Sequence, residues 1–266
     1  MQCDIGNAML GYEEAGRGRP VVWLHAFPLD RQMWRGQLKA LSPSGRMIAV
    51  DLRGFGESSQ FTEEPSIDRM ADDVALLLDR LGITEPVVVA GLSMGGYVAL
   101  AVARRHAERL AGLILADTRA EADAAQARSG REQMIALAEQ GSAAAVIDQM
   151  MPRMVSEQTR QERPQVLEQI RRIASAQSTL AMANAQRAMR DRADSREILS
   201  KIRVPALVTG GAEDAFSPPT VADELAAGIV AAKRVTIASA GHLSSLERPE
   251  DFNSATEAFL ASLRAR

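Results

Sequence analysis

The sequence contains a single cysteine, Cys3, in 266 residues. One thiol cannot form an internal disulfide, so the chain is not a disulfide-stabilised secreted scaffold. We therefore expect it to function in the reducing cytoplasm. Only three histidines accompany that cysteine, which leaves little material for a zinc site, and we expect no metal.

An excess of positive charge and long apolar runs are also lacking. The 31 basic residues face 34 acidic ones, for a net charge of −3, so we expect no basic surface for nucleic acid. No apolar run approaches the roughly 18 residues that span a bilayer. The segment Met1 to Asp4 shows no basic stretch followed by an apolar one. Neither a secretory signal nor a membrane partner is expected.

The chain does contain a regular alternation of apolar strands and amphipathic helices. Residues 67–81 show helical spacing, whereas 20–24 and 110–116 are continuous apolar runs that are typical of buried parallel strands. This alternation predicts an α/β fold with a mostly parallel sheet and helices on both faces. The predicted strands lie within 2–14 (two strands), 20–24, 47–50, 87–90, 110–116, 206–209 and 234–237, and the predicted helices at 31–41, 67–81, 97–106, 220–227 and 249–263.

Residues 118–194 interrupt the alternation. The stretch is rich in Ala, Arg, Gln, Glu and Met and has no convincing strand. It is far longer than an ordinary crossover between two strands. We expect a helical cap at 118–194, inserted in a core made of 1–117 and 195–266. Its predicted helices lie near 121–140, 142–151, 157–174 and 178–192.

The stretch Val87 to Gly95 organises the chain. Apolar residues run into Gly91-Leu92-Ser93-Met94-Gly95, and an amphipathic helix follows at once. Strand, sharp turn and helix form the context of a nucleophile elbow, whose strained turn needs tiny neighbours such as Gly91 and Gly95. We predict that Ser93 is a nucleophile, backed by the positive end of a helix dipole.

A serine hydroxyl needs a base that removes its proton. His25 precedes the elbow, and His106 lies on a helix beside two arginines. His242 lies in a loop after the last predicted strand, directly behind Gly241. We therefore predict that His242 is the base.

The base needs an acid that orients it. Asp214 lies in a Gly-rich loop after the strand at 206–209, and the chain order Ser, Asp, His favours it. Glu213 and Asp117 are the alternatives. Asp117 ends the strand at 110–116, where it suits a helix cap or a bond to loop backbone better.

An oxyanion needs two backbone N–H donors that point at one place. We predict the N–H of Met94, directly after the nucleophile, and the N–H of Phe27, because Pro28 has none. Candidate pocket residues come from the segment after the first core strand and from the cap, although methionine at helical spacing is also typical of plain core. These candidates are Leu29, Trp34, Met150, Met151 and Met154.

Five motifs together resemble the α/β-hydrolase fold superfamily along nearly the whole chain. They are His25 to Pro28, Asp51 to Ser58, Gly91 to Gly96, Gly211 to Asp214, and Gly241-His242 with Glu247-Arg248-Pro249. The resemblance implies an eight-stranded, mostly parallel sheet with a helical cap. Within the superfamily, His-x-Phe-Pro-Leu-Asp and Gly-Leu-Ser-Met-Gly-Gly resemble the 3-oxoadipate enol-lactonase and carboxylesterase branch.

Ala26 departs from that branch, which usually has glycine after the histidine. A methyl group there narrows the oxyanion loop or shifts Phe27, which affects substrate preference and not the chemistry. A haloalkane dehalogenase is disfavoured, because the resemblance would require aspartate at position 93. We expect His25 and Arg53 to brace neighbouring loops.

The sequence therefore predicts a serine hydrolase that cleaves a carboxylic ester or lactone of a small molecule and needs no cofactor. One alternative is a perhydrolase or cofactor-free haloperoxidase with the same triad. Another is a slow-turnover receptor or signalling protein on the hydrolase scaffold. The sequence shows no evident partner surface, which argues against this alternative. The sequence does not define the oligomeric state or the natural substrate.

Overall fold

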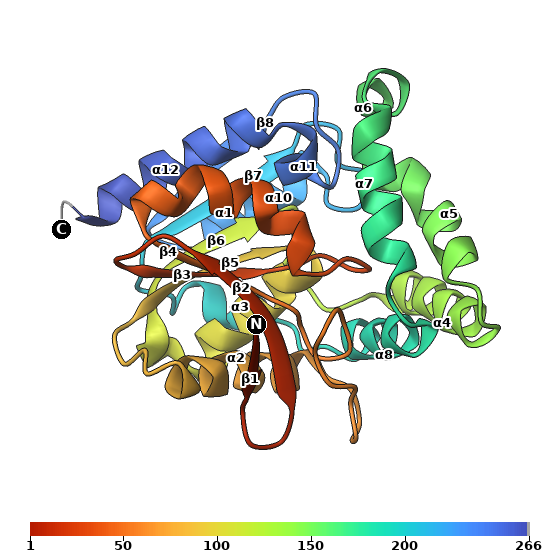
Figure 1. The fold of residues 1–266 in the computed structure, drawn as a ribbon. Helices are drawn as coiled ribbons and strands as arrows, with labels where there is room; N and C mark the ends of the chain where they lie inside the picture. The colour runs from red at the N-terminus through yellow and green to blue at the C-terminus, as the bar shows by residue number, and fades with distance from the viewer. Residues whose placement is uncertain (265–266) are drawn as a thin grey trace.

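An eight-stranded sheet forms the centre of the molecule, as the computed structural model shows for residues 1–264 (Figure 1). The strand order is β1-β2-β4-β3-β5-β6-β7-β8. Strand β2 is antiparallel to β1 and β4, and all other neighbours are parallel. This confirms the predicted sheet. The strands are β1 (Gln2–Asp4), β2 (Met9–Ala15), β3 (Pro20–Leu24), β4 (Arg46–Val50), β5 (Val87–Leu92), β6 (Leu110–Ala116), β7 (Ala206–Gly211) and β8 (Ala232–Ile237).

Helices flank the sheet close to the predicted positions. The main ones are α1 (Arg35–Leu41), α2 (Ile67–Arg80), α3 (Met94–Arg105), α10 (Pro219–Gly228) and α12 (Pro249–Arg264). Short helical turns lie between them: η1 (Arg31–Trp34), η2 (Ser42–Ser44), η3 (Ala107–Arg109), α9 (Arg196–Leu199) and α11 (Ser244–Glu247). The predicted helix at 31–41 is η1 followed by α1.

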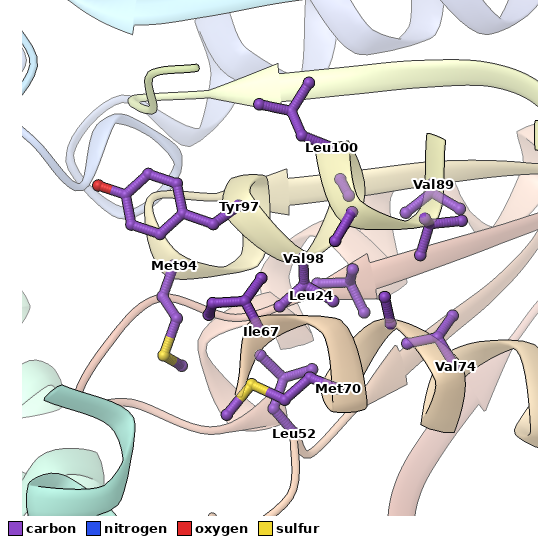
Figure 2. Close-up of a cluster of buried hydrophobic side chains, with 14 of the residues drawn as sticks. Leu24, Leu52, Ile67, Met70, Val74, Val89, Met94, Tyr97, Val98 and Leu100 are labelled. Carbon is purple, nitrogen blue, oxygen red and sulfur yellow. The ribbon is translucent and has the colours of Figure 1, made fainter. Parts of the chain in front are cut away.

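Alternate residues of each buried strand supply the two faces of the sheet, as the two-residue period requires. In β3, Val22 and Leu24 join a core with α2 and α3, whereas Val21 and Trp23 join a core with α1 and α12. Figure 1 shows α1 and α12 on one side of the sheet and α2 and α3 on the other. In Figure 2, Ile67, Met70 and Val74 of α2 lie along Met94 and Val98 of α3.

Five helices lie within residues 118–194, where the sequence predicts the cap. They form a group at one side of the sheet (Figure 1), with α4 packed on α8 and α5 packed on both α4 and α7. They are α4 (Ala125–Glu139), α5 (Ala143–Met154), α6 (Glu157–Glu162), α7 (Pro164–Ser175) and α8 (Thr179–Arg190). Within residues 1–264, no helix is long and apolar enough to cross a membrane.

The prediction of one helix over 157–174 is wrong. Arg163 has φ −128° and ψ 60°, ends α6 and precedes α7, which begins at Pro164. Proline disfavours the helical conformation in the residue before it and has no N–H for the preceding turn. The helix therefore stops at Arg163 and a new one starts at Pro164.

Candidate active site

Ser93 occupies a strained turn between β5 and α3. Its φ is +54° and its ψ is −112°, a conformation that costs a non-glycine residue about 1–3 kcal/mol. A methyl group at Gly91 would lie 2.1 Å from the carbonyl oxygen of Gly95, and one at Gly95 would lie 2.1 Å from the carbonyl oxygen of Leu24. Only glycine fits these two positions, so the local sequence places the Ser93 hydroxyl at the end of β5.

A chain of hydrogen bonds joins Ser93, His242 and Asp214. Nε2 of His242 lies 2.8 Å from Oγ of Ser93. Nδ1 of His242 lies 2.9 Å from each carboxylate oxygen of Asp214. His242 is 6% exposed and Asp214 is 3% exposed. The side chains predicted as nucleophile, base and acid thus meet at one edge of the sheet.

The acid loop, residues 212–217, holds Asp214 toward the imidazole. Its Oδ1 accepts N–H bonds from Phe216 (2.8 Å) and Ser217 (2.9 Å). Burial alone lowers the pKa of His242, but the charge and hydrogen bond of Asp214 outweigh it, so the pKa lies above 6.5. The ring of Phe216 packs on the imidazole with centroids 4.9 Å apart. His242 is therefore held both by charge and by packing.

The other two histidines have structural contacts. Nε2 of His25 accepts the N–H of Leu52 at 3.0 Å, so its Nδ1 bears the proton and donates to Ala26 O at 3.0 Å. This links the loops after β3 and β4, and burial lowers the pKa of His25. Nε2 of His106 lies 2.8 Å from Oδ1 of Asp72, which belongs to α2. Neither histidine touches the hydroxyl of Ser93.

The two alternatives for the acid have other hydrogen-bond partners than His242. Glu213 points to solvent and donates its N–H to Ala240 O. Asp117, only 1% exposed, bonds loop backbone: its Oδ1 accepts the N–H of Gly211 at 2.8 Å, and its Oδ2 is bonded to the Ser244 hydroxyl. Burial, reinforced by Asp214, raises the pKa of Asp117 to about 8.

Arg53 forms a buried ion pair with Asp73 of α2. Its Nη2 lies 2.6 Å from Oδ1 and its Nε lies 2.7 Å from Oδ2, and both side chains are 2% exposed. Nη2 also donates to Asn7 Oδ1 at 3.1 Å. Arg53 thus links the loop after β4 to α2 and to the β1–β2 turn.

Glu247 is a site neighbour that the sequence reasoning missed. Its fully buried carboxylate accepts the N–H of Gly241 at 2.8 Å and the N–H of Ser156 at 2.7 Å. Gly241 precedes His242, and Ser156 lies between α5 and α6. The Leu243 N–H also donates to Met154 O at 3.1 Å. The histidine loop, residues 239–243, is therefore fastened to the α5–α6 junction. The motif Gly-His with a later Glu-Arg-Pro was the only sequence signal for this contact.

The candidate pocket residues separate into different surroundings. Trp34 is fully buried and packs on Trp23 (centroids 4.9 Å) and Phe252 (6.1 Å), which places it in the core beside α12. Leu29, Met151 and Met154 are buried in that same core. Met150 is half-buried and packs against both cores.

No group of three or more His, Cys, Asp or Glu side chains within residues 1–264 is arranged to hold a metal ion. The chemistry of the site is that of a hydroxyl, an imidazole and a carboxylate.

A sharply turned serine between a parallel strand and a helix, with a histidine and an acid from later strand ends, is the arrangement of α/β hydrolases. A family model described as the alpha/beta hydrolase fold matches residues 19–249. The chain belongs to the α/β-hydrolase fold family.

Relatives of this chain include lactonases, esterases and haloperoxidases. It is 30% identical to 3-oxoadipate enol-lactonase 2 from Acinetobacter baylyi, over 96% of this chain and 94% of that protein. It is 39% identical to the solved structure of a thermophilic esterase from Thermogutta terrifontis, with a TM-score of 0.94, over 96% of this chain and 94% of that one. A 105-residue stretch is 39% identical to a non-heme chloroperoxidase from Kitasatospora aureofaciens and covers 39% of this chain and 38% of that protein.

Proposed function

We propose that this chain is a serine hydrolase that cleaves a carboxylic ester or lactone through an acyl-enzyme, with Ser93 as nucleophile, His242 as base and Asp214 as orienting acid. The continuous hydrogen-bonded path from Ser93 Oγ to the Asp214 carboxylate supports this proposal most. The similarity to an esterase and to an enol-lactonase supports the substrate class.

The first half-reaction forms the acyl-enzyme. Nδ1–H of His242 donates to Asp214, which leaves Nε2 free to accept the hydroxyl proton of Ser93. Oγ attacks the carbonyl carbon while that proton moves to Nε2. His242 then returns the proton to the leaving oxygen as the acyl C–O bond breaks.

The second half-reaction uses water in place of the alcohol. His242 takes a proton from the water, the hydroxide attacks the acyl carbon, and the proton returns to Ser93 Oγ as the acid leaves. For a lactone the leaving oxygen belongs to the same molecule, so one hydroxy acid is released. Every bond and proton is balanced without a cofactor.

The N–H groups of Phe27 and Met94 are the proposed oxyanion donors. Met94 is the first residue of α3, where the N–H has no partner within its helix and the helix dipole favours negative charge. Within residues 1–264, neither N–H is bonded to a protein acceptor. Loss of one such donor costs a transition state about 3–4 kcal/mol.

We further propose that α4 to α8 act as the cap, residues 118–194, that closes over the site. The bond from Leu243 N–H to Met154 O and the carboxylate of Glu247 connect this group of helices to the histidine loop. Met150, which is half-buried and packs against both cores, is the proposed pocket residue among the methionines.

The variant Ser93→Ala tests the function. We expect kcat for p-nitrophenyl acetate to fall by roughly 10⁶-fold, as in a comparable triad, because no nucleophile remains. The exposed Ser200→Ala is the matched control and should keep the wild-type rate. A serine-directed phosphonate should label wild type and Ser200→Ala at Ser93. Ester turnover by Ser93→Ala within tenfold of wild type would refute the assignment.

A perhydrolase activity is the second candidate, because a 105-residue stretch is similar to a chloroperoxidase. Hydrogen peroxide would then replace water in the attack on the acyl-enzyme and yield a peracid. Competition between peroxide and water for the acyl-enzyme, measured as peracid formed per ester cleaved, separates the two activities.

A further inference from the structure

Asp117 is a second buried carboxyl beside Asp214 and His242, and the proposed mechanism does not use it. Asp117 follows β6 directly and has φ +48°, a left-handed conformation that is uncommon outside glycine. Its N–H donates to Thr209 O of β7 at 3.0 Å. The neighbouring Thr118 hydroxyl donates to Ser93 O at 2.9 Å. The strained residue is therefore fixed in place by β7 and by the nucleophile turn.

The carboxyl of Asp117 joins the two loops that hold the base and the acid. Oδ1 accepts the N–H of Gly211, three residues before Asp214, at 2.8 Å. Oδ2 is hydrogen-bonded to the hydroxyl of Ser244, two residues after His242. The side chain thus bridges the acid loop and the segment that follows the histidine.

Burial and the charge of Asp214 disfavour a negative charge on Asp117. The groups that favour one are His242, the Ser244 hydroxyl and the Gly211 N–H, none of which is an arginine or lysine. Asp214 already bears the negative charge that pairs with His242. An ionised Asp117 would be a second carboxylate in the same water-poor site, and like charges so placed do not both ionise easily.

Arg119 lies two residues after Asp117 in the chain. It donates to the carbonyl oxygen of Phe216 and is half-buried. Its charge lowers the pKa of His242, in opposition to Asp214. It therefore acts on the base and the acid loop rather than as a partner of Asp117.

We propose that Asp117 is a positioning residue that works as a neutral carboxylic acid: its carbonyl oxygen accepts from Gly211 N–H, and its hydroxyl donates to Ser244 Oγ, which holds the acid loop and the histidine loop in register. This inference rests on the proposed function for its catalytic consequence. A carboxylate would accept the Ser244 hydroxyl proton at Oδ2, whereas in the proposed state the Ser244 oxygen accepts the proton of the acid, as a hydroxyl oxygen can.

Asparagine distinguishes the neutral acid from the carboxylate. A carboxylic acid offers one acceptor and one donor, and so does the Asn amide, whereas a carboxylate only accepts. Asn also tolerates a positive φ better than most residues. Asp117→Asn therefore reproduces both bonds of a neutral Asp117, and Asp117→Ala reproduces neither.

The first test compares kcat and KM of these two variants with p-nitrophenyl acetate. Asp117→Ala should lower kcat by roughly 10–100-fold with KM within threefold, because a small displacement of the base can cost about 10²-fold. Asp117→Asn should restore kcat to within threefold of wild type and leave the acidic limb of the pH–rate profile in place. Asp223→Asn, exposed on α10, is the control.

Two outcomes of this test would overturn the proposal. An Asp117→Asn variant as slow as Asp117→Ala would show that the negative charge is required. A folded Asp117→Ala variant with wild-type kcat would show that the bridge does not position the base. If Asp117→Ala does not fold, Ser244→Ala removes one of the two bonds and should lower kcat in the same direction.

The second test needs no substrate, so its result is independent of the proposed function. The unfolded chain ionises Asp117 near pH 3.9, whereas the folded chain retains the proton up to about pH 8. Between these values the folded state binds more protons, so wild type loses stability as pH rises. We therefore compare the folding equilibrium constants of Asp117→Asn and wild type. Their ratio should increase by up to tenfold for each pH unit between pH 5 and pH 8. A constant difference over that range would overturn the neutral-acid assignment.

Discussion

The carbonyl oxygen of Leu24, at the end of β3, lies against the α-carbon of Gly95 in the first turn of α3, where a methyl group would come within 2.1 Å. This contact between strand and helix leaves no room for a side chain. We predict that Gly95→Ala lowers the free energy of unfolding by about 1–3 kcal/mol, because the added methyl group forces the backbone to move. We expect the rate of ester cleavage to fall as well, because Gly95 lies two residues after Ser93. Chemical denaturation and the initial rate measure the two effects.

Gly130→Ala is the matched control for Gly95→Ala. Gly130 lies inside α4, and apart from the adjoining backbone of its own helix no atom lies within 4 Å of the position its methyl group would take. Alanine in a helix interior is more favourable than glycine by about 0.5–1 kcal/mol. We therefore expect a small gain in stability at unchanged activity. Equal losses in both variants would contradict the role given to the Leu24–Gly95 contact.

The pH dependence of kcat/KM should report on His242. If His242 is the base, it must be neutral to accept a proton from Ser93, and Asp214 raises the pKa of His242 above 6.5. The rate should therefore fall as pH drops through a midpoint higher than that of an ordinary histidine. A flat profile between pH 5 and 8, with the fold intact by circular dichroism, would exclude His242 as the base.

Glu247→Gln should weaken the hold on the histidine loop. The carboxylate accepts N–H bonds from both Gly241 and Ser156, whereas an amide would face one of these donors with its own NH₂ group. Loss of a buried hydrogen bond to a charged group costs about 1.5–3 kcal/mol. We expect that decrease in the free energy of unfolding and a kcat about tenfold lower at similar KM, since displacement of the base slows the chemistry.

Glu250→Gln serves as the comparison, because Glu250 is exposed in the first turn of α12. An exposed substitution of this kind changes stability by within about 0.5 kcal/mol. If Glu247→Gln behaves like Glu250→Gln, the link between the histidine loop and the α5–α6 junction has no influence on the base.

Trp34 and Met150 should differ in what they control. Trp34 packs in the core on Trp23 and Phe252, so Trp34→Ala should cost about 3–5 kcal/mol of stability without changing the preference among p-nitrophenyl esters of different chain length. Met150→Ala should do the reverse and alter KM for the longer esters. A change of chain-length preference in Trp34→Ala would assign that tryptophan to the pocket after all.

Most of the fold could be predicted from apolar periodicity. The buried strands and the helix over 67–81 are long or strongly patterned, and the structure has them within two or three residues. The proline at position 164 indicates a break between two helices, but the residues around it favour helix, and the sequence pattern therefore predicts one continuous helix. The four-residue helix α11 (Ser244–Glu247) is too short to show a period.

The part of the candidate site that consists of reactive side chains could be predicted from the sequence. Ser93, Asp214 and His242 follow from a motif, a chain order and the scarcity of histidine, and they lie together, although their catalytic roles stay predictions. For Asp117 the sequence indicates a helix cap or a bond to loop backbone, and Asp117 does accept the N–H of Gly211. Its second partner, the Ser244 hydroxyl, and the two N–H partners of Glu247 could not be predicted, because tertiary packing brings them near. Nothing in the residue types marks Gly241 or Ser156 as a donor to Glu247.

The bonds of Met154 and Ser156 to the residues around His242 bear on how such enzymes could be recombined. A chimera that exchanges residues 118–194 for the equivalent helices of another hydrolase would also exchange Met154 and Ser156, which contact the residues around the imidazole. Such a chimera would acquire the substrate preference of the other hydrolase but would misplace the imidazole of His242. The histidine loop of the other hydrolase would therefore have to be exchanged together with its helices.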